Sequence, residues 1–249
     1  TAALLAAVLA LSIALPVFAS DDGDTIYINS VSDLLSLAKN CAYDQWSVGK
    51  TVILQKDLSL EGMLWEPIPS FSGQFKGNGH TISDLTITGQ YSPAGLFGIV
   101  EEQGSIESLS VRGIVSVSDS ADTTTGGIVG INHGTLINCQ FTGVVTGDSE
   151  VGGIVGRNES EGTIDHSTAR AIVTGKSSTG GIAGYNLGAI TGCTNVGSIN
   201  TEYQEASLDT DGFTAKMVDQ INNKMAAADD DATNSVSYTH LTLPTKRIV

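Results

Sequence analysis

The chain has 249 residues, of which 12 are Lys or Arg and 27 are Asp or Glu, so its net charge is −15. Nucleic acids and anionic membranes attract basic surfaces, and this charge argues against both as partners. The three cysteines are too few for a disulfide framework.

An apolar segment opens the chain. Residues 1–19 end in Val17-Phe18-Ala19, which is typical of a secretory cleavage site. We predict that this segment is a signal peptide whose N-terminal part is missing, with a retained membrane anchor as the alternative. A secreted or cell-surface location follows.

Residues 20–50 are expected to form an N-terminal cap. Thr25–Asn29 has the pattern of a short strand, and Ser30–Asp33 resembles a capping box at the start of a helix. Such a helix would cover the open edge of the first coil of a repeat domain. The residues at helical spacing are Leu34, Leu35, Leu37, Ala38 and Cys41.

From residue 51 the pattern of apolar residues becomes strand-like. Further along the chain, one seven-residue motif occurs three times. Gly126–Asn132, Gly152–Asn158 and Gly180–Asn186 begin 26 and 28 residues apart. A fixed period of this length indicates stacked β-coils, each of which buries its apolar side against the next. The alignment predicts four internal columns: Ile128, Ile154 and Ile182; Leu136, Ile164 and Ile190; Val145, Val173 and Ile199; Cys139, Ser167 and Cys193.

Structural roles are predicted for the repeated glycines, asparagines and cysteines. The asparagines are interpreted as a ladder or a turn, because Asn bonds readily to its own backbone. Cys139 and Cys193 lie two coils apart, roughly 9–10 Å, which exceeds disulfide reach. All three cysteines, Cys41 included, are interpreted as small buried residues. The predicted repeat positions are Gly95, Gly98, Gly127, Gly130, Asn132, Gly153, Gly156, Asn158, Gly181, Gly184, Asn186, Cys139 and Cys193.

These phrases carry a family resemblance. Gly152–Asn158, followed by Gly162-Thr163-Ile164, resembles the GLUG repeat of secreted and surface-attached bacterial proteins. Ala94–Gly98 matches the phrase that names the family, and Phe75–Ile87 is similar to its opening coil. The resemblance covers about residues 51–200 and implies an all-β, right-handed β-helix or solenoid of about five coils. The family occurs in adhesin-like proteins and in non-catalytic front regions of immunoglobulin-cleaving metallopeptidases.

Residues 201–235 are predicted to hold an amphipathic helix and the start of a linker. Phe213, Met217, Ile221 and Met225 recur every fourth residue, so we expect the helix to cover the far end of the solenoid. Residues 236–249 include the translation of one reading frame of a transposase sequencing adapter. We therefore expect them not to be native.

Few residues of the chain are candidates for catalysis or metal binding. The chain contains no His-Glu-x-x-His zinc motif, and Ser207–Gly212 matches a calcium loop poorly. Trp65 and Phe71 are expected in the core, with sugar stacking as the alternative. Several acids crowd one repeat and are interpreted as a solvated edge: Glu159, Glu161 and Asp165, beside Arg170. The histidines are interpreted as surface or turn residues: His80, His133, His166 and His240.

We therefore predict a non-catalytic secreted or cell-surface module that serves as an adhesin, a stalk or a glycan-contacting surface. Catalytic residues, metal sites and cofactors are not expected. The expected partner is an extracellular glycan or a host or matrix protein; nucleic acid and direct membrane binding are not expected, and the module should be monomeric. The alternatives are a carbohydrate-active β-helix enzyme, and the accessory front region of a longer surface metallopeptidase.

Overall fold

The computed structural model describes residues 25–43, 45–117 and 123–200. The predicted signal peptide, C-terminal helix, calcium-loop segment, adapter-derived tail and His240 lie outside these residues.

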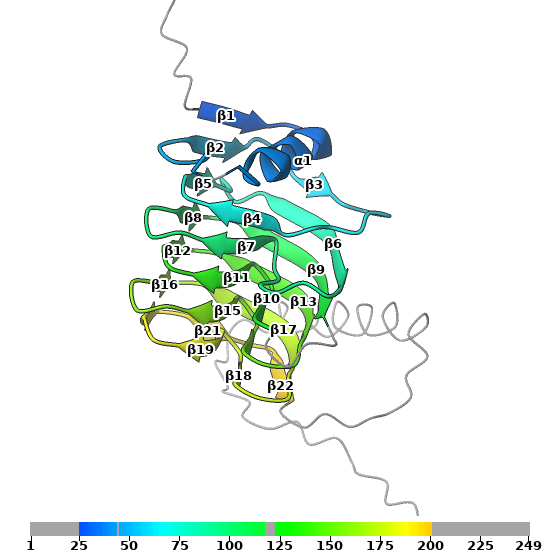
Figure 1. The fold of residues 1–249 in the computed structure, drawn as a ribbon. Helices are drawn as coiled ribbons and strands as arrows, with labels where there is room; N and C mark the ends of the chain where they lie inside the picture. Colours follow the sequence, from blue (N-terminus) through cyan, green and yellow to red (C-terminus); the bar gives the residue numbers. More distant parts are fainter. Residues whose placement is uncertain (1–24, 44, 118–122, 201–249) are drawn as a thin grey trace, which may run out of the picture.

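The described chain winds into stacked coils whose strands pair in parallel between successive coils (Figure 1). Three sheets run along the stack. Sheet A contains β1 (Thr25–Ile28), β2 (Thr51–Leu54), β5 (Gln74–Lys76), β8 (Ser105–Glu107), β12 (Thr135–Ile137), β16 (Thr163–Asp165) and β20 (Ala189–Thr191). Sheet B contains β3 (Leu58–Ser59), β6 (Thr81–Gly89), β9 (Ser110–Val117), β13 (Gln140–Thr146), β17 (Thr168–Thr174), β21 (Thr194–Asn195) and β22 (Ser198–Asn200). Sheet C contains β4 (Ile68–Phe71), β7 (Phe97–Val100), β11 (Val129–Asn132), β15 (Val155–Asn158) and β19 (Ala183–Asn186).

The all-β solenoid is thus confirmed, with about six turns where the sequence indicated about five. The additional turn is the first one, which begins at β2 and pairs in parallel with β5. This first turn lacks the glycine-rich motif of the later coils, so it could not be recognised as a repeat from the sequence.

The core contains columns of equivalent side chains. Leu136 pairs with Ile164 and then Ile190, as the alignment predicts. Val145 pairs with Val173 and then Ile199. In the first coils the core contains larger rings: Phe71, Phe75 and Phe97 pack with centroids 5.4–6.3 Å apart. Trp65 is also buried, and its Nε1 donates to the Leu96 carbonyl at 3.2 Å, so the core interpretation of Trp65 and Phe71 is confirmed.

A single helix in the described residues, α1 (Val31–Asn40), lies beside the first strands at one end of the stack (Figure 1). The Ser30 hydroxyl caps it by accepting from the Asp33 N–H at 3.2 Å, and the Asp33 carboxylate accepts from the Asn29 N–H at 2.9 Å. Leu34 and Leu37 are buried. Leu35 was expected on the same side but is exposed, and the side chains that α1 buries are those of Leu34 and Leu37.

A short fourth sheet explains one of the repeated glycines. Sheet D contains β10 (Thr125–Gly126), β14 (Val151–Gly152) and β18 (Thr179–Gly180). The segment that leads into each of these strands lies over sheet C of the next coil, so that a Cβ on Gly156 would stand 2.6 Å from the Thr125 nitrogen. Gly130 is covered in the same way by Pro93 and Ala94. A side chain at this position would collide with main chain.

Gly127 and Gly153, the second glycines of their repeats, are crowded by different neighbours. A Cβ on Gly127 would overlap the Phe141 ring, and one on Gly153 would overlap the Gly181 carbonyl. The segment that contains Gly95 is one residue shorter than the equivalent segment of the next coil. Ala94 pairs with Thr125 and Phe97 pairs with Val129, so three residue steps lie opposite four.

The repeated asparagines stack in register at the end of the sheet C strands. Asn132 Nδ2 donates to Asn158 Oδ1 at 2.8 Å, and Asn158 Nδ2 donates to Asn186 Oδ1 at the same distance. Each side chain also closes its own turn: Asn158 Nδ2 donates to the Gly162 carbonyl at 3.1 Å. Asn132 and Asn158 are fully buried. One coil earlier Val100 occupies the position, so the ladder begins at Asn132.

The three cysteines are free thiols. Cys139 and Cys193 share a column with Ser167, whose hydroxyl accepts from the Cys139 N–H at 3.1 Å. Cys41 and Cys139 are buried, but Cys193 is only half-buried, which corrects the expectation for this residue. Cys193 belongs to the last described coil, on which no further described coil stacks. Burial raises the pKa of Cys41 to about 11 and that of Cys139 to about 12.

The buried thiol of Cys139 makes stability depend on alkaline pH. Its pKa rises from 9.0 to about 12 on folding, so its stabilising contribution is complete below pH 9 and is lost as the pH rises from 9 toward 12. We expect the free energy of unfolding to fall across this window in urea titrations. Cys139→Ser, which introduces the residue found at Ser167, should make the fall shallower. An unchanged slope would contradict this prediction, and Cys193→Ser, at a less buried thiol, is the control.

Candidate functional site

Two adjoining depressions mark the outer face of sheet B. Their cavity volumes are about 430 and 390 Å³, and they share Ser83 and Arg112. Together they cross β3, β6, β9 and β13, so they run along the stacking axis for roughly 15 Å at one strand spacing per coil. We call this feature the axial groove. Its polar and apolar lining residues include Asp57, Ser59, Glu61, Thr81, Ser83, Asp84, Thr86, Arg112, Ile114 and Thr142.

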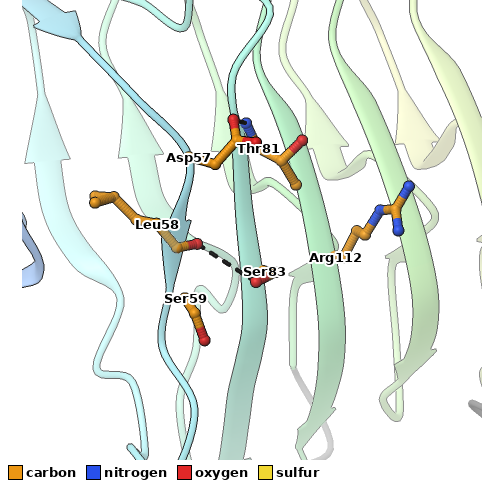
Figure 2. Close-up of a pocket in the computed structure, with 6 residues that line it drawn as sticks. All are labelled: Asp57, Leu58, Ser59, Thr81, Ser83 and Arg112. Atoms are coloured by element: carbon orange, nitrogen blue, oxygen red, sulfur yellow. Dashed lines mark hydrogen bonds between the residues drawn. The ribbon is translucent and has the colours of Figure 1, made fainter.

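Asp57 lies at one end of the axial groove (Figure 2). Its Oδ1 accepts from the Thr81 N–H at 2.9 Å and lies 3.2 Å from His80 Nδ1. The Thr81 hydrogen bond, followed by that of His80, holds the pKa of Asp57 below its ordinary value. Arg112, one strand beyond Ser83 in Figure 2, adds a smaller electrostatic contribution. The Asp57 carboxylate is therefore ionised at neutral pH.

Asp84 enters the groove through an irregularity in β6. The register of β6 against β9 shifts between Ile82 and Leu85, and Asp84 has a left-handed φ of 60°. Such bulges reorient side chains locally. Asp84 Oδ2 accepts from the Ser59 and Ser83 hydroxyls at 2.6 and 2.7 Å. These two hydrogen bonds, that of Ser59 first, lower the pKa of Asp84.

The axial groove is equipped to form hydrogen bonds. Asp57 and Asp84 are ionised acceptors with free lone pairs, Arg112 is an exposed donor, and the hydroxyls around them can donate or accept. A glycosidase instead needs a carboxylic acid that stays protonated near neutral pH. The lowered pKa values of Asp57 and Asp84 do not suit that role. Within the residues that the structure describes, no group of three or more His, Cys, Asp or Glu could hold a metal ion.

The acids that crowd one repeat in the sequence do not form a cluster of their own. Asp165 Oδ1 lies 2.9 Å from His166 Nδ1 at the surface. Glu159 lies 3.5 Å from Arg157. Of the predicted surface histidines, His166 thus contacts the carboxylate of the residue before it, whereas His80 contacts Asp57 of the preceding coil.

A different ion pair, which was not expected from the sequence, joins Glu150 to Arg157 of the same repeat and contacts residues of both neighbouring coils. Arg157 Nε donates to Glu150 Oε2 at 2.8 Å, and the Thr124 hydroxyl donates to the same oxygen at 2.9 Å. The guanidinium lies 5.2 Å from the centre of the Tyr185 ring, one coil further. Burial tends to raise the pKa of Glu150, but the hydrogen bonds from Arg157 and Thr124 outweigh it and the pKa is lowered. We interpret this cluster as a structural clamp.

The geometry defines a repeat protein of the parallel β-solenoid class. Comparison with protein families refines this class: the model of the GLUG motif matches residues 147–174. The resemblance seen in the sequence is thereby confirmed: residues 147–174 contain a GLUG motif, and they form one coil of the solenoid. No helix among the described residues is long and apolar enough to cross a membrane.

Two curated relatives are far longer than this chain. Halomucin of Haloquadratum walsbyi is 31% identical in an alignment of 155 positions, and the match covers 57% of this chain and 2% of halomucin. A protein of Evansella cellulosilytica, described as a candidate Gly-rich membrane protein, is 30% identical in an alignment of 137 positions, and the match covers 40% of this chain and 16% of that protein. Among solved structures, a candidate immunoglobulin A1 protease from Bacteroides ovatus is similar with a TM-score of 0.45 and 15% identity, covering 74% of this chain and 79% of the other.

Proposed function

We propose that this chain is a non-catalytic module displayed at the cell surface, which contacts a hydroxyl-rich glycan through the axial groove. The observation that carries the proposal is the groove itself: an open, shallow surface that crosses four strands and is lined by ionised carboxylates, hydroxyls and one exposed arginine. Sugar hydroxyls can donate to the carboxylates of Asp57 and Asp84 and accept from Arg112.

The shape of the groove favours an extended ligand. Each coil adds a strand at the same spacing, so a polymer that lies along the stacking axis meets donors and acceptors from successive coils. The acidic net charge of −15 favours a neutral glycan over an anionic one. A surface location is supported by the predicted signal peptide and by the relative described as a membrane protein. The rigid stack also suits a stalk that holds the groove away from the cell.

An array of neutral and acidic glycans, probed with the purified chain, tests this proposal. We expect binding to neutral polysaccharides, and Arg112→Ala should weaken it about ten-fold or more, since hydrogen bonds to charged groups contribute about 1.5–3 kcal/mol. Arg112 is exposed, so the variant should fold normally. Lys76→Ala, on the outer face of sheet A, is the matched control and should bind as the wild type does.

Three outcomes would overturn the proposal. A blank array would leave only the stalk role, and equal affinity of both variants would exclude the axial groove as the contact surface. Release of sugars from a bound polysaccharide would assign a carbohydrate-active enzyme instead.

A further inference from the structure

The last described coil exposes residues that are buried in every coil where the alignment repeats them. Ile190 is 38% exposed and Ile199 is 42% exposed, whereas their column neighbours Ile164 and Val173 are fully buried. This coil is formed by β19 to β22 and lies at the end of the stack opposite α1 (Figure 1).

Two further apolar side chains border the same end. Leu187 and Val196 are exposed by 53% and 58%, and together with Ile190 and Ile199 they form what we call the terminal apolar face. Large contiguous apolar surfaces on soluble proteins mark contact sites. The strands of this coil also present backbone groups that have no further described strand to pair with, and such edges invite association unless they are covered.

The other end of the solenoid shows how this chain covers an edge. There α1 packs the buried side chains of Leu34 and Leu37 against the first coil. The covering element is therefore an amphipathic helix that belongs to the same chain and lies next to the coil in sequence.

We propose that residues 213–225 of this chain dock on the terminal apolar face and close the solenoid. Their sequence places Phe213, Met217, Ile221 and Met225 on one side of a helix and polar residues such as Asn223 on the other. About 12 residues separate Asn200 from this segment, a connection that can span roughly 40 Å. This proposal is independent of the glycan-binding proposal above.

The thiol of Cys193 reports on this contact. Cys193 belongs to the last described coil and is half-buried, whereas Cys41 and Cys139 are buried elsewhere. We expect a thiol reagent, with mass spectrometry to locate the label, to modify Cys193 slowly in the full chain. Ile221→Asp places a charge in the docked face, and it should raise the labelling rate at Cys193 about ten-fold or more. Labelling at Cys139 should remain slow.

Asn223→Asp is the matched control because it adds the same charge on the polar side of the segment, and it should leave the labelling rate unchanged. Amide exchange of β19 to β22, which does not depend on the thiol, should accelerate only in the Ile221→Asp variant. Equal Cys193 rates and equal exchange in the wild type and Ile221→Asp would overturn the proposal. Protection that grows with protein concentration, together with a dimer in sedimentation, would also overturn it and assign the face to a second copy.

Discussion

Replacing Asn158 with Leu should lower the free energy of unfolding by about 2–4 kcal/mol, because buried donors and acceptors lose their partners. Asn158 connects the ladder on both sides: its Oδ1 accepts from Asn132, and its Nδ2 donates to Asn186 and to the Gly162 carbonyl. The leucine cannot replace these bonds, and it lies in a fully buried position. Urea unfolding followed by circular dichroism measures the change.

Asn186→Leu is the control for this prediction. Asn186 occupies the same ladder position in the last described coil, but it is exposed and water can satisfy the groups it leaves. We expect a loss of less than about 1 kcal/mol. If both variants lost the same amount of stability, burial of the ladder would not be the source of its contribution.

Replacing Gly156 with Ala should lower the free energy of unfolding by about 2–3 kcal/mol, the upper part of the usual range for forced overpacking. The new Cβ would stand 2.6 Å from the Thr125 nitrogen and 2.8 Å from the Gly130 carbonyl oxygen. Both are main-chain atoms of hydrogen-bonded strands, so neither can move without disturbing sheet C or sheet D. Thermal unfolding should show a decrease of roughly 5–10 °C.

Gly98→Ala tests whether glycine is needed at this motif position in every coil or only where main chain leaves no space for a Cβ. Gly98 occupies the equivalent position in an earlier coil, but its nearest neighbours would stand 3.0 and 3.3 Å from a Cβ. The coil before it contributes no strand to sheet D, so no turn covers this glycine. We expect a loss below about 1 kcal/mol. A large loss at Gly98 would show that glycine is needed for backbone conformation rather than for space.

The internal columns could be predicted from the sequence because they repeat. Ile164 and Val173 stand at fixed offsets within a period, and in a parallel solenoid a fixed offset places equivalent residues in register. Sheet D could not be predicted in this way. Each of its strands has two residues, too few to show an alternating pattern, and its glycines also fit ordinary turns.

The axial groove and the Glu150–Arg157 clamp depend on residues that do not repeat. Arg157 occupies a variable position, where neighbouring coils have Ile131 and Tyr185. Its partner Glu150 lies in a turn that has no distinctive sequence. The groove gathers Asp57, Asp84 and Arg112 from three different coils, and Asp84 reaches it only because β6 is irregular. Such contacts leave no signal in the repeat pattern, because the residues that make them do not recur from coil to coil.

The parallel stacking has a mechanical consequence for a protein that is held at one end and pulled at the other. The hydrogen bonds between coils point along the stack, and a terminal coil is bonded to one neighbour only. A pull on the chain end would therefore peel the terminal coil from the stack first and open the coils one at a time. Each coil of 26–28 residues would release roughly 90 Å of chain, at about 3.4 Å per residue. The solenoid would then lengthen in steps under load and limit the force that reaches its attachment.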